Sequence, residues 1–243
     1  MSKILLGIKD LKDIEKYPVD GYVLGYEKYT LFAPNRFSYE EIKSLKNKDN
    51  IYILLNALIH QDNLQDFKLE VQKLIELKVR FIIQDMGAFA AISGLVSPSH
   101  IIFNPYTLIS NTNDFITYKV LTKAGIGISN QLDINEIISL SKNKNAFLMI
   151  YGYEPIYQSF RKVLSLYQEA INLHLINEQL YLKEDTREDL YPVIENEYGS
   201  VIFNYRKVNL LDHINELNEC EYFYVDSFLT SDEEIDDVIR RLK

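Results

Sequence analysis

The chain has few of the residues that build metal clusters, disulfides or flexible linkers. Of its 243 residues one is cysteine, none is tryptophan, nine are glycine and six are proline. A single cysteine, Cys220, excludes an internal disulfide and an iron–sulfur cluster or zinc site held by several thiolates. Because Cys220 stands just before an apolar run, we interpret it as an inert buried thiol rather than a nucleophile.

The sequence also has no apolar run long enough to cross a bilayer. Its first residues, Met1-Ser2-Lys3, lead into a strand-like segment without the apolar stretch of a signal peptide. The formal net charge of −9 disfavours direct contact with nucleic acid. We therefore expect a cytoplasmic protein that does not bind membranes and reaches nucleic acid only through a local basic patch or a partner.

No motif for a metal or a nucleotide is apparent. The four histidines lack metal-ligand spacing, and there is no Walker loop, dinucleotide fingerprint or nucleophile elbow. The acidic run from Asp232 to Asp237 is interpreted as the first turn and solvated face of a helix. The spacing of Ser231 and Glu234 predicts a capping box at its start. We predict no cofactor, and the role of a metal ion is left open.

Short apolar runs alternate with segments of helical period along most of the chain. This pattern is typical of a parallel sheet whose strands are joined by helices. The number of strands is the one that a closed barrel requires. The predicted strands are Lys3–Ile8, Gly21–Leu24, Ile51–Leu55, Arg80–Gln84, His100–Phe103, Gly125–Ile128, Ala146–Ile150 and Tyr222–Val225. The predicted fold class is therefore α/β, a (β/α)8 TIM-type barrel in one domain over residues 1–243.

One stretch departs from the alternation. Tyr191–Ile194 and Ser200–Asn204 are strand-like and flank a loop that contains Gly199, which predicts a β-hairpin. A preceding run, Gln179–Lys183, has the pattern of a strand that pairs with it. We expect this hairpin, at about residues 179–205, as an insertion between the seventh and eighth barrel strands.

Polar side chains follow the predicted strands, at the end of a barrel where ligands bind. They are Asn56, Asp85, Asn104, Asn130 and Tyr151. Such a ring of side chains predicts a site for a small polar molecule. Asn and Asp are also common turn residues, so an interpretation as plain turns stays open.

A second group of candidates lies further along the chain, where Tyr151 and Tyr153 are followed by Arg161, Glu184 and Arg187. Arginine matches a carboxylate with two parallel hydrogen bonds. The group therefore predicts a ligand that combines a ring with carboxylates. In the alternative interpretation, Glu184 and Arg187 pair with each other and stabilise the hairpin.

Several short motifs in this region resemble a known family when their order and spacing are taken together. They are Gly152-Tyr153-Glu154-Pro155-Ile156, Ser159, Arg161-Lys162, Leu182-Lys183-Glu184 with Arg187, Tyr191-Pro192 with Glu195, Gly199-Ser200 and, upstream, Asn56 and Asp85-Met86-Gly87. The chain resembles the collagenase-like peptidase family U32 over almost its whole length. It is most similar to the short members of that family, the small tRNA-hydroxylation proteins of Gram-positive-type bacteria.

The resemblance implies a β/α barrel with a part in the oxygen-independent, prephenate-dependent hydroxylation of the tRNA wobble uridine. Prephenate carries a ring and two carboxylates, in agreement with the aromatic and arginine residues above. Larger relatives have a histidine at the seventh strand and cysteines that hold an iron–sulfur cluster. Here Tyr151 replaces that histidine, and Pro155 and Lys162 stand at cysteine positions. The resemblance thus implies a cluster-less small subunit, with a larger family paralogue as its partner.

Two alternatives stay open. A peptidase, as the family is named, needs an activated nucleophile or a metal-bound water, and the sequence identifies neither. A non-catalytic binding or regulatory barrel is indicated by the lost cysteines. It is also indicated by Asn130-Gln131-Leu132, which stands where the family has Arg-Glu-Leu. Whether the chain is an enzyme is therefore left open.

Overall fold

Eight parallel strands close into a barrel in a computed structural model that describes residues 2–106, 108–172 and 179–243. They follow the order β12-β1-β2-β4-β5-β6-β7-β8, and β12 closes the ring by pairing with β8. The strands are β1 (Lys3–Gly7), β2 (Gly21–Tyr26), β4 (Ile51–Leu55), β5 (Arg80–Ile83), β6 (Ile101–Phe103), β7 (Gly125–Gly127), β8 (Ala146–Ser159) and β12 (Tyr222–Val225). The predicted barrel is confirmed, and each of its eight predicted strands is present.

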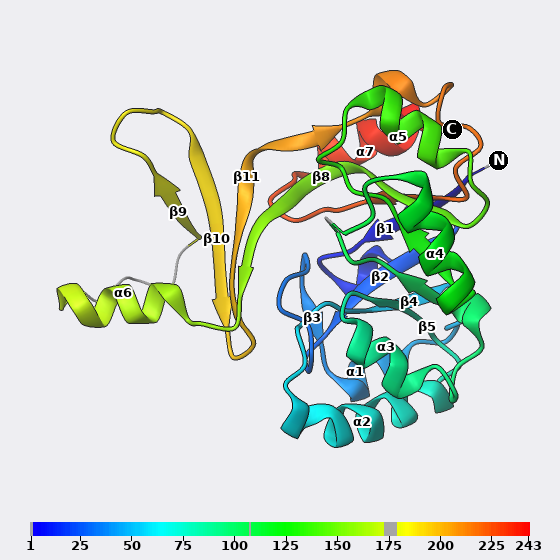
Figure 1. Ribbon diagram of the computed structural model, residues 1–243, viewed down its shortest axis with the longest axis horizontal. Helices are drawn as coiled ribbons and strands as arrows, with labels where there is room; N and C mark the ends of the chain where they lie inside the picture. The colour runs from blue at the N-terminus through cyan, green and yellow to red at the C-terminus, as the bar shows by residue number, and fades with distance from the viewer. Residues whose placement is uncertain (1, 107, 173–178) are drawn as a thin grey trace.

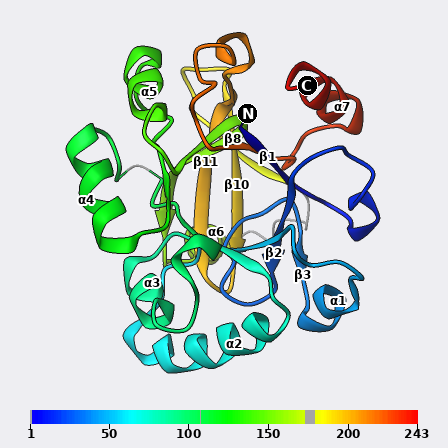
Figure 2. The ribbon, with the colours of Figure 1, turned by 90° about the vertical axis from the view of Figure 1, so that its right-hand side faces the viewer.

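Helices surround the strands on the outside, as the view along the barrel shows (Figure 2). In α2, for example, Phe67, Val71 and Leu74 form a buried stripe at helical spacing. The outer helices are α1 (Tyr39–Ser44), α2 (Leu64–Glu76), α3 (Met86–Ile92), α4 (Thr112–Thr122), α5 (Ile134–Ser141) and α7 (Asp232–Arg241). Short 3-10 turns lie at Leu11–Asp13, Gln61–Asn63, Pro98–His100 and Leu211–His213, and a two-residue strand, β3 (Arg36–Phe37), pairs with β2. Within the described ranges, no helix combines the length and the apolarity that a membrane crossing needs.

The barrel is packed with side chains, so it is not a pore. Successive residues of each strand alternate between the interior and the helix-facing layer: Leu5 points inward and Leu6 outward. Tyr52 and Tyr222 belong to the interior cluster and lie near its amino-terminal end, where Arg80 and Lys3 stack on their rings. That end is therefore closed. A ligand site has to form at the opposite end, called here the mouth, where the strands have their carboxyl ends.

A sheet-and-helix arm projects from the barrel (Figure 1). The arm comprises residues 153–172 and 179–209: the outer half of β8, α6 (Val163–Ile171), β9 (Leu180–Lys183), β10 (Leu190–Asn196) and β11 (Gly199–Asn209). The predicted hairpin and the pairing of its preceding strand are confirmed, since β10 pairs antiparallel with both β11 and β9.

The predicted end of the seventh strand at Ile150 is wrong, because β8 continues to Ser159 and pairs with β11 outside the barrel. Glycine and proline are both uncommon inside strands, and β8 contains Gly152 and Pro155. Gly152 adopts a φ of +136° within the strand, and Pro155 lies beside an irregularity in the pairing, where a missing N–H is tolerated.

The arm is tied to the barrel a second time at the tip of its hairpin. The Arg36 guanidinium pairs with the Glu197 carboxylate at 2.7 Å. Asn196 Nδ2 donates to the carbonyl oxygens of Thr30 at 3.2 Å and Leu31 at 2.9 Å. The hairpin therefore bridges back to the loop that follows β2.

The loop after β2 is held in turn by Asn56, whose side chain is fully buried at the end of β4. Its Oδ1 accepts from the backbone N–H groups of Leu31 at 2.9 Å and Phe32 at 3.3 Å, and its Nδ2 donates to Phe32 O at 2.8 Å. Asn56 was predicted as a ligand contact. Its amide oxygen and amide nitrogen instead both form hydrogen bonds to the loop that borders the mouth.

We predict that Asn56→Ala lowers the free energy of unfolding by roughly 3 kcal/mol or more, because each buried polar group left without a partner costs about 1–3 kcal/mol. Urea unfolding followed by circular dichroism measures the loss. Asn63→Ala is the matched control, since Asn63 is exposed and its side chain makes no cap hydrogen bond. The control should change the free energy by less than about 0.5 kcal/mol. Equal effects of the two substitutions would contradict the prediction.

Candidate functional site

Side chains from four neighbouring parts of the barrel enclose a small cavity at the mouth. Its lining residues are Asn104, Tyr106, Ile128, Asn130, Phe147, Met149, Glu154 and Tyr224. They follow β6 and β7 or belong to β8 and β12. The free volume is about 10 Å³, room for about one water molecule. Of the side chains predicted at strand ends, Asn104 and Asn130 are brought together here.

Glu154 is the acidic residue that lines this cavity. It lies on β8 where the strand leaves the barrel and is only 6% exposed. From the described residues, no hydrogen bond or ion pair reaches its carboxyl. Burial raises the pKa of that carboxyl to about 7. A carboxyl with such a pKa exchanges its proton near neutral pH, which is the property a general acid or base needs.

A second acid, Asp226, lies behind the cavity at the end of β12. Its Oδ2 accepts from Tyr224 Oη at 2.8 Å, and its Oδ1 accepts from the backbone N–H of Phe228 at 2.7 Å. Burial nevertheless raises the pKa of Asp226, and it raises the pKa of Tyr224 well above the usual range. Tyr224 therefore keeps its proton and holds it toward Asp226.

The lining of the cavity includes no lysine or arginine. A carboxylate placed here would face Glu154, and Asp226 behind it, without a compensating cation, which is electrostatically unfavourable. The cavity is better suited to a neutral polar group that hydrogen-bonds to Asn104, Asn130 or Glu154.

Three glycines make room for these side chains. A Cβ at Gly127 would overlap the Asn104 amide, and one at Gly7 would lie 2.7 Å from Tyr224 Oη. At Gly152 the Cβ would lie 2.6 Å from Asp226 Cβ. Glycines at the mouth ends of β1, β7 and β8 are thus a sequence signal for the site. The sequence analysis did not select Glu154, although it follows the predicted seventh strand within four residues, and it did not identify Tyr106 or Tyr224.

Other predicted residues have structural partners. The Asp85 carboxylate caps α3 by accepting from the Ala88 N–H at 2.7 Å. Asn130 lines the cavity, but its Nδ2 donates to Met149 O at 2.7 Å. Asn104 is therefore the predicted amide whose side chain is best placed to meet a ligand.

Tyr151 and Tyr153 lie beside a partly exposed ion pair between the barrel's last helix and the arm. Lys207 Nζ contacts the two Glu234 carboxylate oxygens at 2.7 and 2.8 Å and lies 5.6 and 5.5 Å from the two tyrosine ring centres. Tyr151 Oη donates to the same carboxylate. The predicted capping box at Ser231 is therefore only half formed: its Oγ accepts from the Glu234 N–H at 3.2 Å, while the Glu234 carboxylate turns toward Lys207.

Arg161, Glu184 and Arg187 do not reach the cavity. Arg187 Nε pairs with Glu184 Oε2 at 3.4 Å in the exposed turn between β9 and β10. Arg161 lies at the opposite end of β10, where its carbonyl oxygen accepts from Ser200 Oγ at 2.9 Å. The structure thus agrees with the interpretation of Glu184 and Arg187 as a pair within the hairpin.

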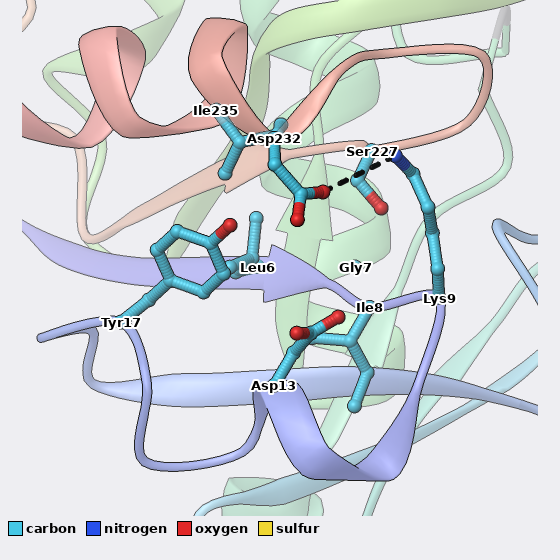
Figure 3. A pocket seen from close by; sticks show the side chains of 9 residues that line it. All are labelled: Leu6, Gly7, Ile8, Lys9, Asp13, Tyr17, Ser227, Asp232 and Ile235. Carbon is cyan, nitrogen blue, oxygen red and sulfur yellow. Dashed lines mark ion pairs between the residues drawn. The ribbon is translucent and has the colours of Figure 1, made fainter.

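A second pocket lies at the ends of β1 and β12 (Figure 3). Asp13 and Asp232 face each other across it, with Tyr17 and Lys9 on the other two sides. Asp232 is already paired with Lys9 at 3.8 Å and Lys16 at 3.1 Å. The carboxylates of this second pocket are therefore largely neutralised by neighbouring lysines. We assign the candidate site to the Glu154 cavity instead.

The described residues contain no group of three or more His, Cys, Asp or Glu side chains placed to hold a metal ion. Cys220 lies just before β12, at the closed end of the barrel, and is 1% exposed. Burial raises the pKa of its thiol to about 12, and the thiol donates to Ala146 O at 3.4 Å. Cys220 is buried, as predicted, and its single sulfur does not fit an iron–sulfur cluster.

A closed β/α barrel with a protonatable carboxyl in its strand-end cavity belongs to the class of barrels that place small-molecule sites at the mouth. The chain belongs to peptidase family U32, whose model matches residues 7–242. It is similar to tRNA hydroxylation protein P2 of Bacillus subtilis (strain 168), with 21% identity over 241 residues, covering 90% of this chain and 76% of that protein. No solved structure matches the chain.

We expect Gly127→Ala to displace the Asn104 amide, because the added methyl group would occupy its place. Overpacking of this kind costs about 1–3 kcal/mol of unfolding free energy. Gly94→Ala is the control, since no atom lies within 4 Å of a Cβ built there. Thermal or urea unfolding compares the two variants. A Gly127→Ala protein as stable as the Gly94→Ala protein would show that the amide has room to move.

The stability of the protein should depend on pH through Glu154. Its carboxyl has an ordinary pKa of 4.5 and a raised pKa of about 7 in the folded chain, so its contribution to stability is full below pH 4.5 and is lost as pH rises to about 7. The raised pKa of Asp226 acts in the same direction.

Between about pH 5 and about pH 8, the free energy of unfolding of the wild type should decrease as pH rises. In Glu154→Gln this decrease should be smaller by an amount on the order of 3 kcal/mol. Urea unfolding across this range measures it. Glu76→Gln, at an exposed position on α2, is the matched control and should leave the slope as it is. A wild-type curve that rises with pH in this window would contradict the assignment.

Proposed function

We propose that this protein takes part in the hydroxylation of the tRNA wobble uridine, as a small U32 subunit without an iron–sulfur cluster. The proposal rests on the similarity to tRNA hydroxylation protein P2, which extends over 90% of the chain. The match to the family over residues 7–242 supports it, because the similarity then includes the barrel and the arm together.

Within this function we propose Glu154 as the group that gives or accepts a proton. Its support is geometric: a buried carboxyl that no described side chain neutralises, facing a cavity at the mouth of the barrel. Asn104 would orient a single neutral polar group of the substrate, or a water molecule, beside it.

The remaining requirements of the reaction point to a partner. The net charge of −9 disfavours tRNA binding by this chain alone, and a single cysteine cannot hold a cluster. Arg161 and Arg187 are not assembled around the cavity, so we propose that prephenate, the carboxylate-bearing oxygen donor, binds on a larger family paralogue. The small chain would contribute the Glu154 cavity.

The geometry favours this proposal over a peptidase. The lone thiol is buried at the closed end with a raised pKa, and the described residues contain no group of three or more His, Cys, Asp or Glu side chains placed to hold a metal ion. Cleavage of casein by the purified protein with divalent metal ions would reverse this preference.

The deciding measurement is mass spectrometry of tRNA nucleosides from the source organism with the gene deleted and then restored. Deletion should remove the hydroxylated wobble uridine and its derivatives. Wild-type and Glu76→Gln genes should restore them, whereas Glu154→Gln should restore less than about a tenth, since acid–base groups contribute about a hundredfold or more.

An unchanged nucleoside profile after deletion would overturn the proposed function. Full restoration by Glu154→Gln would keep the function and remove the acid–base role. The chain would then be a binding or regulatory subunit. Immunoblots of both variants, at wild-type protein levels, would exclude loss of folding as the cause.

A further inference from the structure

The inner strands of the arm, which are the outer half of β8 and β11, cross the mouth of the barrel. Figure 2 shows β11 passing behind the centre of the barrel. Gln158, on the outer half of β8, donates through Nε2 to the carbonyl oxygen of Asn56 at 3.0 Å and accepts from Gln84 Nε2 at 2.6 Å. Asn56 follows β4, which stands opposite β8 in the ring of eight strands. The arm therefore spans the mouth from one side to the other.

Aromatic rings fill the space beneath these strands. Phe203 of β11 packs against Phe32, from the loop after β2, with 5.4 Å between the ring centres. Phe203 also lies 5.0 Å from Phe228, which follows β12. Phe32 in turn lies 5.4 Å from Tyr106, a residue that lines the Glu154 cavity. We call these four rings the aromatic seal, because the arm and the barrel loops together cover the cavity with them.

The seal leaves too little room for a substrate. The Glu154 cavity, of about 10 Å³, has room for about one water molecule. Phe32 also lines a larger, open pocket of about 430 Å³ between the hairpin tip and the loop after β2. The contact between Phe32 and Tyr106 thus joins the wall of the open pocket to the wall of the cavity. A molecule larger than water has to displace this contact to reach Glu154.

The sheet of the arm is interrupted where such a movement would begin. The pairing of β11 with β8 breaks between Phe203 and Lys207, and residues 204–206 of β11 have only Glu154 of β8 opposite them. Extra residues of this kind disrupt the ladder and bend the strand locally. On the barrel side of the interruption, Lys207 is held by Glu234 at 2.7 Å. A bend at residues 204–206 would therefore lift Phe203 and leave Lys207 in place.

The contacts that hold the arm down are only moderately strong. The Arg36–Glu197 ion pair at the hairpin tip is partly exposed, with side-chain exposures of 33 and 52%, and exposed ion pairs contribute little. Beside Gln158, the Gln84 Oε1 atom is buried and accepts no hydrogen bond from the described residues. The Glu154 carboxyl is in the same position. Water would reach both groups when the arm lifts, which offsets part of the cost of opening.

We propose that the arm is a lid on the Glu154 cavity, which opens by bending at residues 204–206 when the hairpin tip separates from the loop after β2. Opening carries Phe203 away from Phe32 and joins the open pocket to the cavity, so that substrate enters beside the hairpin tip. Closure returns the aromatic seal and excludes water from Glu154. The proposal rests on the proposed function in taking this cavity as the site, but it does not depend on which reaction occurs there.

Thiol labelling of the purified full chain tests the proposal, because the single cysteine, Cys220, is 1% exposed at the closed end of the barrel. Met149→Cys places a second thiol on the wall of the cavity, where Met149 is 7% exposed. Labelling with methyl methanethiosulfonate is followed by mass spectrometry. The introduced thiol should react at least about tenfold faster than Cys220, since lid opening requires less of the structure to separate than unfolding does.

Adding Arg36→Ala/Asn196→Ala to Met149→Cys should make the introduced thiol react about tenfold faster again, because the ion pair and the hydrogen bonds at the hairpin tip are lost. Arg240→Ala, which removes an exposed ion pair on α7, is the matched control and should leave this rate as it is. Leu74→Ala, in the buried stripe of α2, should speed the labelling of Cys220 alone, because it weakens the barrel and not the lid.

Equal rates for the two thiols would overturn the proposal, because the cavity would then open only by unfolding. So would a rate of the introduced thiol that Arg36→Ala/Asn196→Ala leaves unchanged, or one that Leu74→Ala raises as much as it raises that of Cys220. If circular dichroism shows that Met149→Cys does not fold, Ile128→Cys on another wall of the cavity repeats the measurement. The labelling contains no tRNA, so the lid and the proposed function can fail separately.

Discussion

The arrangement of the whole molecule depends on one strand that belongs to two sheets. Within the barrel, β8 pairs with β7 on one side and β12 on the other, and it closes the ring. Beyond the barrel, the same strand pairs with β11 and carries the arm. The change of partners takes place around Gly152, where the backbone has a positive φ and Asp226 lies too close for any Cβ. A side chain at this position would disturb barrel closure, arm direction and the Asp226 region together.

This exchange of partners also explains why Glu154 lies where it does. It stands just beyond the point at which β8 leaves the barrel and before the irregular pairing near Pro155. The strand pairing on both sides of this point therefore fixes the position of the Glu154 carboxyl. None of the described residues forms an ion pair or a hydrogen bond with it. A buried acid without a partner lowers the free energy of unfolding at neutral pH. Proteins retain such groups mostly at functional sites.

The sequence was sufficient for the barrel because each buried strand is short, apolar and bounded by turn residues. It was also sufficient for the hairpin, where Gly199 follows a strand-like run. It was insufficient for the outer half of β8, since Gly152 and Pro155 normally interrupt strands and are accommodated here only by tertiary packing. For the site, strand-end position identified Asn104 and Asn130. Arg161 and Arg187 had suitable chemistry for a carboxylate, but their location depends on the length and direction of the arm, which local patterns do not encode.

The tyrosines at the closed end of the barrel have a consequence for the traffic of ligands. Tyr52 and Tyr222, stacked under Arg80 and Lys3, leave no passage through the floor. A molecule that reaches the Glu154 cavity has to arrive past the arm and depart the same way. Entry to the cavity and exit from it therefore share one opening, at the mouth of the barrel.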